Sequence, residues 1–531
     1  MDRSRIHLRS LTLPLTLALL AAMPIRAQDH THEHGELGSL RFPSSCSAAA
    51  QPVLERGVAM LHSFWFDQAQ ATFREAAAAD PACAMAHWGE AMTLLGNPFT
   101  GVSPAEPQLR AALAAARASV DGARTPRERA YAEAVLALYQ DYPTVDHRTR
   151  LRAHEEAMRR VREAHPDDAE AAIFYARAVI ANAPPSDLTF ARQLFAAQIL
   201  DSLFRAQPEH PGLAHYTIHA YDAPPIARQG LEAARRYAGI APAAPHALHM
   251  PSHIFTRLGY WDESIETNRR SAAAEPDSNA AVHPNDYLVY AYLQQGRDAE
   301  AERVVHRAVN NTDRFYGTVQ AYNYGAMPAR LALERGRWAD AAALPLSTGA
   351  PRHVEAITRF ARALGAARGG QADAARAEVG ALAALADSLT ARRDEYWATI
   401  VGAQRLAAEA WLARAEGDDA RALRLAGEAA ALEETVEKHP VTPGPILPAR
   451  ELLGDLLLEL RRPAEARQAY EATLRREPNR ARALFGAARA AELAGDAPAA
   501  RAHYQHLLEL MRAADAERGE ARAARAFLAG P

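Results

Sequence analysis

Two histidine pairs with the same internal spacing are the residues of this chain best suited to chemistry. His215 and His219 form one H-x3-H pair, and His249 and His253 form a second pair 34 residues later. On a helix, positions i and i+4 share one face, with Cβ atoms about 5–6 Å apart. Neighbouring packed helices lie about 8–10 Å apart, so the four imidazoles could meet between them. The spacing therefore predicts a candidate metal site formed by these four residues.

The identity of the metal stays open between zinc, copper and iron. Met250 lies beside His249, and a thioether with imidazoles suits copper, whereas imidazoles with a carboxylate such as Asp222 suit zinc or iron. Pro251 lies between His249 and His253, where it removes a helical hydrogen bond and bends the helix. The bend would either aim the two imidazoles or separate them.

Structural histidines are the alternative interpretation of the same pattern. Buried polar groups usually find partners within the protein, and 21 histidines produce some pairs by chance. The pair His215 and His219 has the spacing of a zincin motif, but no glutamate follows the first histidine. Serine hydrolase, Walker A and Rossmann motifs are absent as well. No motif supports catalysis, and the sequence favours a protein that is not an enzyme.

The elements that must position these histidines form a repeat. Residues 259–276 run from a glycine and an aromatic pair to a closing proline, and six further segments partly match them. This pattern resembles the turn and second helix of the tetratricopeptide repeat family. Ala466 and Ala500, like Tyr470 and Tyr504, are 34 residues apart, which fixes the period. The partial matches are residues 64–81, 296–313 and 461–478, and stretches from 336, 417 and 495 onward.

The resemblance implies an all-α fold, a tetratricopeptide-type α-solenoid in which helix pairs stack into a right-handed superhelix. In this family the first helices line a concave groove, and set positions of each unit face the bound ligand. By that resemblance the four paired histidines face the groove. The further groove residues it implies are Asp222, His246 and His283, and aromatic residues that could hold a peptide or small ligand are Tyr287 and Tyr290.

The predicted organisation follows the repeats and the proline content. Four prolines between residues 438 and 450 predict a hinge, because proline interrupts regular helix. The predicted segments are a signal peptide at 1–27, a histidine-containing flexible arm at 28–45, N-terminal repeat units at 46–96, a degenerate helical region at 97–176, a central repeat array at 177–437, the hinge at 438–450 and C-terminal repeat units at 451–531.

The N-terminus predicts export. Arg3, Arg5 and Arg9 precede an apolar stretch, and Ala27 ends a plausible cleavage site, so we expect a periplasmic or secreted protein. An oxidising compartment makes a disulfide between Cys46 and Cys83 reasonable, with two buried thiols as the alternative. No later segment is apolar enough to span a membrane.

The charge composition limits the classes of partner that we expect. The formal net charge is −4 over 531 residues, with acids and bases interspersed, so nucleic acid is excluded as an expected partner. Lys438 is the single lysine among 60 basic residues, which we attribute to coding bias. The first functional hypothesis is an exported scaffold that binds a peptide or protein partner in its groove. The competing hypothesis is a metal-binding protein or metalloenzyme that uses the groove histidines and a divalent transition metal.

Overall fold

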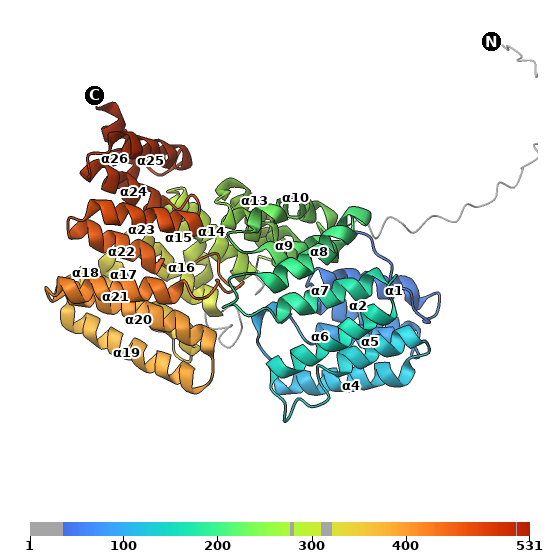
Figure 1. The fold of residues 1–531 in the computed structure, drawn as a ribbon. Coiled ribbons are helices and arrows are strands. Elements are labelled where there is room, and N and C mark those ends of the chain that lie inside the picture. The colour runs from blue at the N-terminus through green and yellow to red at the C-terminus, as the bar shows by residue number, and fades with distance from the viewer. Residues whose placement is uncertain (1–35, 277–280, 310–320, 517, 531) are drawn as a thin grey trace, which may run out of the picture. The chain divides into compact units, whose positions relative to one another are not determined.

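The computed structural model describes residues 36–276, 281–309, 321–516 and 518–530. These residues belong to one compact unit, residues 34–531. The predicted signal peptide and most of the predicted arm lie outside the described residues, so export remains a prediction. The described residues form α-helices and short 3-10 turns without any strand (Figure 1).

The helices follow one another as hairpin-like pairs, and most of them pack chiefly against the helices next to them in the chain. The fold is therefore an all-α solenoid of the tetratricopeptide type, in agreement with the repeat pattern. The helices of the N-terminal half are α1 (Ala50–His62), α2 (Phe66–Ala79), α3 (Ala84–Thr93), α4 (Glu106–Gly122), α5 (Pro126–Leu136), α6 (His147–Ala164), α7 (Ala169–Ala181), α8 (Ala191–Ala206), α9 (Pro211–Tyr221), α10 (Leu231–Ile240), α11 (Pro245–His249), α12 (Pro251–Arg257) and α13 (Trp261–Ala274).

The helices of the C-terminal half continue the array. They are α14 (Val282–Gln294), α15 (Asp298–Val309), α16 (Ala321–Glu334), α17 (Trp338–Ala342), α18 (Arg352–Arg368), α19 (Ala372–Ala391), α20 (Glu395–Ala415), α21 (Asp419–Glu433), α22 (Ala449–Glu459), α23 (Pro463–Arg476), α24 (Ala481–Leu493), α25 (Ala497–Leu510) and α26 (Gly519–Ala529). The 3-10 turns are η2 (Pro98–Thr100) and η3 (Ala227–Gly230). No helix of the described part is long and apolar enough to cross a membrane.

Close helix crossings set the repeat. The ring of Tyr470 in α23 packs against α22 and α24 where both carry glycine, and a Cβ added at Gly486 would lie 2.3 Å from that ring. The first unit repeats the arrangement, because the ring of Phe73 in α2 faces Gly57 and Gly89 of the flanking helices. A large side chain on the second helix and glycines on its neighbours thus interlock, as dense packing requires.

The proline-rich segment before α22 is largely buried and bonded to the central helices. Val441, Thr442, Ile446 and Leu447 are buried. Arg330 of α16 donates to the carbonyl oxygens of Gly444 and Pro445, both at 2.7 Å. The segment therefore packs against helices that precede it by more than a hundred residues.

The two cysteines lie at the N-terminal end of the array and form a disulfide. Cys46 precedes α1, Cys83 caps α3, and their Cα atoms are 4.7 Å apart. The bond ties the start of the first unit to the start of the second.

We expect thiol labelling of the unfolded, unreduced protein to find no free thiol. Reduction should lower the free energy of unfolding by about 2–4 kcal/mol, because the closed loop restricts the unfolded chain. Two labelled thiols in protein isolated from an oxidising compartment would contradict the pairing.

Gly486→Ala should lower the free energy of unfolding by about 1–3 kcal/mol, because the added methyl group overlaps the Tyr470 ring. Gly427→Ala in α21 is the matched control: no atom lies within 4 Å of the added Cβ, and alanine favours helix by about 1 kcal/mol. Chemical denaturation measures both. Equal shifts for the two variants would show that the crossing is not close.

Candidate metal centre

Successive first helices of the central units bring six histidines together. Helix α9 carries His215 and His219, while α11 and α12 carry His246, His249 and His253. Helix α14 of the next unit adds His283. The i, i+4 pairs lie on one face of their helices, and stacking the units brings the faces together.

Pro251 divides the second helix without separating its histidines. The helix is interrupted between α11 and α12 at Met250, although the backbone of this residue keeps helical angles, with φ −53° and ψ −35°. The imidazoles of His249 and His253 consequently still converge, with 3.0 Å between their Nε2 atoms. Met250 itself is fully buried in the apolar core.

The first cluster consists of His215, His219 and His246, which hold candidate ligand atoms within 4.8 Å of one another. The Nε2 atoms of His219 and His246 lie 3.1 and 3.2 Å from His215 Nε2. His215 Nδ1 lies 2.6 Å from the backbone carbonyl oxygen of His62. A carbonyl only accepts, so Nδ1 carries the proton of the neutral ring and Nε2 presents a lone pair to the cluster.

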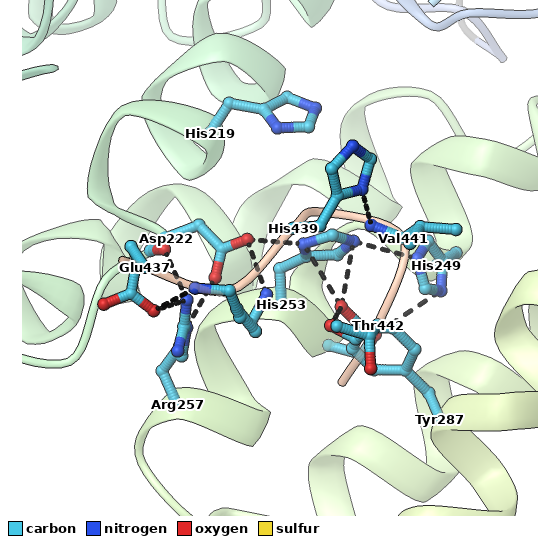
Figure 2. Close-up of polar contacts among 12 residues, drawn as sticks. His219, Asp222, His249, His253, Arg257, Tyr287, Glu437, His439, Val441 and Thr442 are labelled. Atoms are coloured by element: carbon cyan, nitrogen blue, oxygen red, sulfur yellow. Dashed lines mark hydrogen bonds and ion pairs between the residues drawn. The ribbon is translucent and has the colours of Figure 1, made fainter. Parts of the chain in front are cut away.

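The second cluster consists of His249, His253 and His283, again within 4.8 Å of one another. His253 Nδ1 lies 2.8 Å from Asp222 Oδ2, and His249 Nδ1 lies 2.7 Å from Asn268 Oδ1. Figure 2 shows His253 between Asp222 on one side and His249 on the other. Asn268 donates its Nδ2 to the Ser264 carbonyl, which fixes its oxygen as the acceptor toward His249.

These outer partners leave no proton between His249 and His253. Both rings donate from Nδ1, and burial lowers the pKa of each, that of His249 well below the usual value. The Nδ1 hydrogen bonds place the proton of each neutral ring on Nδ1, so at neutral pH the two Nε2 lone pairs face each other across 3.0 Å. The Tyr287 hydroxyl lies 3.4 Å from His253 Nε2, but it has a single proton, and the Thr442 carbonyl oxygen at 3.3 Å competes for it.

The first cluster also contains ring nitrogens whose contacts cannot all be hydrogen bonds. Two nitrogens, from His219 and His246, converge on the single lone pair of His215, which can accept only one of them. Burial holds the pKa of all three rings well below the usual value. In the second cluster, His283 Nδ1 is buried with no hydrogen-bond partner among the described residues.

A third group, His62, Glu170 and His210, has a similar spread of atoms but ordinary hydrogen bonding. Each histidine lies 2.9 Å from its own oxygen of Glu170 through Nε2. The Nδ1 of His210 accepts from the Leu213 amide, and the Nδ1 of His62 lies 3.1 Å from the Tyr216 hydroxyl. Every contact in this group can hold a proton, so it is a satisfied network, and the carbonyl of His62 supports His215.

Buried charges surround the second cluster. Besides His253, the carboxylate of Asp222 contacts Arg257 at 2.9 Å and Lys438 Nζ at 3.1 Å. Arg257 also pairs with Glu437 at 2.7 Å. Burial alone would raise the pKa of Asp222, but the positive charges of Lys438 and Arg257 beside the carboxylate hold that pKa well below its usual range. Asp222 is thus an ionised acceptor that orients His253.

A cavity of about 560 Å³ adjoins the first cluster. His219 and Asp222 form part of one wall, and Trp397, Lys438 and His439 contribute to others. A space of this volume is within the range of small-molecule sites. The imidazole of His219 therefore borders a space that a ligand could enter.

The structure places each predicted site residue. It brings His215 and His219 into one cluster and His249 and His253 into another, so the four do not surround a single point as predicted. His246 and His283, predicted as groove residues, complete the two triads. Asp222 bonds to His253 and does not face the clusters as a ligand.

The two predicted groove tyrosines are fully buried. Tyr287 packs against the second cluster, with ring centroids 4.9 Å from His249 and 5.1 Å from His283. Tyr290 packs against Trp261 and contacts Arg480. Neither side chain is open to a peptide in this structure.

Sequence reasoning missed several contributors because they lie on other elements, 19 to 216 residues away along the chain. Asn268 and the carbonyl of His62 orient ring nitrogens, and Lys438 contacts Asp222 across more than two hundred residues. Only the isolated lysine carried a signal, since a single lysine among so many arginines is unusual.

Comparison with known proteins supports the assignment of tetratricopeptide-type repeats, and it does not point to an enzymatic activity. The profile of the family described as "Tetratricopeptide repeat" matches residues 66–98 and 452–518. No curated protein matches the sequence. Among solved structures, that of the APC/C hetero-tetramer Cut9-Hcn1 matches at 12% identity and a TM-score of 0.34, covering 93% of this chain and 79% of that one. Yeast Tom70 matches at 11% identity and a TM-score of 0.32, covering 90% and 96%.

The matches of the family profile agree with the helix pairs α2–α3 and α22–α25. Residues 66–98 and 452–518 are therefore tetratricopeptide repeats, within an all-helical array of the kind suited to protein–protein interaction.

Proposed function

We propose that this protein binds transition-metal ions, one at each histidine cluster. The observation that carries the proposal is the 3.0 Å contact between His249 Nε2 and His253 Nε2 in the protein interior. The hydrogen bonds from both Nδ1 atoms leave these two nitrogens without a proton between them. Such a contact is repulsive unless a cation lies against both lone pairs. Neutral imidazole is also the form that binds metal.

The surroundings of the clusters support the proposal. Metal-binding histidines usually donate their other ring nitrogen to a carboxylate, amide or carbonyl oxygen. His253, His249 and His215 do so to Asp222, Asn268 and the carbonyl of His62. The third group, His62 with Glu170 and His210, serves as the internal comparison, because its protons account for every contact.

The ligand set is imidazole alone in both clusters, which suits zinc, copper and iron. Three protein ligands leave coordination positions free, which is typical of sites that bind an exogenous ligand. Rings of the two clusters approach to 5.9 Å between His219 and His253, and again between His246 and His249. Two bound ions would therefore be neighbours, and the cavity beside His219 would give a ligand access to the pair.

Binding of a peptide or protein partner, and export, stay predictions. The helical array suits a partner, but the histidine face is largely covered by the chain itself, including Thr442, which accepts from Tyr287 through its carbonyl at 3.3 Å. A partner would need another face of the array.

Metal content tests the proposal on protein purified without a histidine tag, stripped with a chelator and then supplied with zinc, copper or iron. We expect each cluster to take up one ion, and His249→Ala and His215→Ala each to lose one of the two. The predicted arm could bind metal by itself, so His30, His32 and His34 should be replaced by alanine throughout. His506→Ala, on the surface of α25, is the control and should retain both ions. Uptake of no ion by folded protein would refute the proposal.

Asn268→Leu should weaken binding at the second cluster about 10–100-fold, because His249 loses the acceptor that fixes its ring. The first cluster should keep its affinity, since Asn268 does not contact it. Competition with a chelator of known affinity measures both sites. Unchanged affinity at both would show that Asn268 only packs against the ring.

A further inference from the structure

Phe64 occupies a backbone position where the other units mostly have glycine. It immediately precedes the N-cap of α2, and its φ is 52°, in the left-handed region. The corresponding residues before α13, α15, α17, α21 and α25 are glycines with φ between 62° and 86°: Gly259, Gly296, Gly336, Gly417 and Gly495. A side chain is unfavourable in this conformation, and Arg461 before α23 is a second exception to the glycines, with φ 57°.

The Phe64 ring contacts every imidazole of the first cluster. Its centroid lies 4.5 Å from that of His215 in an edge-on arrangement and 5.4 Å from that of His246 in a stacked one. The distance to His219 is 6.2 Å, and Phe99 packs closer on that ring at 4.1 Å. Phe64 is only 8% exposed, so its ring lies in the interior against the cluster.

The two clusters hold their rings by different means. In the second cluster, Asp222 and Asn268 bond to ring nitrogens and fix two of the three rings. In the first cluster, only His215 has such a partner. Within the described part of the chain, the sole hydrogen-bond contact of the His219 and His246 rings is the one with His215 Nε2. Aromatic packing must therefore orient these two rings.

We infer that Phe64 is a positioning residue of the first cluster, where its ring holds the three imidazoles in their converging arrangement and shields a bound ion from solvent. The inference rests on the proposed metal binding and adds that the two ion positions differ. The first is packed by the apolar rings of Phe64 and Phe99, and the second is held by polar partners together with the Tyr287 ring. An apolar shell controls how readily water reaches a metal ion.

The release of metal to a chelator tests this role, in a His249→Ala background so that only the first cluster is loaded. The probe is copper or zinc alone, whichever ion the parent protein retains. We expect Phe64→Gly to speed release from the first cluster about tenfold or more, because the rings lose their support and water gains access. The same substitution also relieves the backbone conformation, so faster release cannot be attributed to a strained turn.

Arg461→Gly is the matched control. Arg461 precedes the N-cap of α23 with φ 57°, the same turn position, and lies in no histidine cluster. Its replacement should leave the release rate unchanged. If Phe64→Gly does not fold, Phe64→Leu keeps an apolar side chain without a flat ring and should also release metal faster.

The outcomes separate the two proposals. A parent protein that takes up no ion refutes the proposed function, and this inference with it. A parent that retains an ion, with the same release rate in the Phe64 variants, refutes only the role of Phe64. Equal acceleration in Arg461→Gly would also refute that role, because the effect would then belong to the turn.

Discussion

Each helix pair in this chain can bury its apolar faces only against its neighbours in the array, and the remaining features depend on that stacking. Close crossings, such as Tyr470 against Gly486 and Phe73 against Gly89, bring successive helices near enough for their side chains to interlock. The same proximity carries the histidines of α9, α11, α12 and α14 into contact. The close approach of successive helices serves packing in most units. In the three consecutive units that contain α9, α11–α12 and α14, it also creates an interior lined with imidazoles.

Burying six imidazoles requires that their nitrogens be satisfied, and the surrounding residues do this only in part. Asp222, Asn268 and the carbonyl of His62 accept from the outward nitrogens and so direct unprotonated nitrogens inward. The neighbouring group of His62, Glu170 and His210 shows that the fold can satisfy buried histidines fully where a carboxylate is supplied. Among the described residues no carboxylate lies between the inward nitrogens of the two triads, and for that reason a cation is proposed there.

The proline-rich segment joins this interior to the C-terminal units. Its residues accept hydrogen bonds from Arg330 and Tyr287, while Lys438 and Glu437 pair with Asp222 and Arg257. Coding bias accounts for the rarity of lysine in this chain. The one lysine, Lys438, lies next to the carboxylate of Asp222, which orients His253. A compact ammonium group fits beside Asp222 where Arg257 already provides the planar guanidinium.

The sequence by itself determined the helical repeat, its 34-residue period and the two in-register histidine pairs, because helix periodicity and repeat spacing are local properties of the chain. The positions that the repeat resemblance implies also placed His246 and His283 with these pairs, whereas Asp222 orients His253 and is not among the converging ligand atoms. The division of six histidines into two triads was decided only by the tertiary structure, since it depends on the stagger between neighbouring helices. The same holds for the contacts of Phe64, Asn268 and Lys438, which join residues tens to hundreds of positions apart. No local pattern encodes such distances, and only the stacking of the units makes these side chains neighbours.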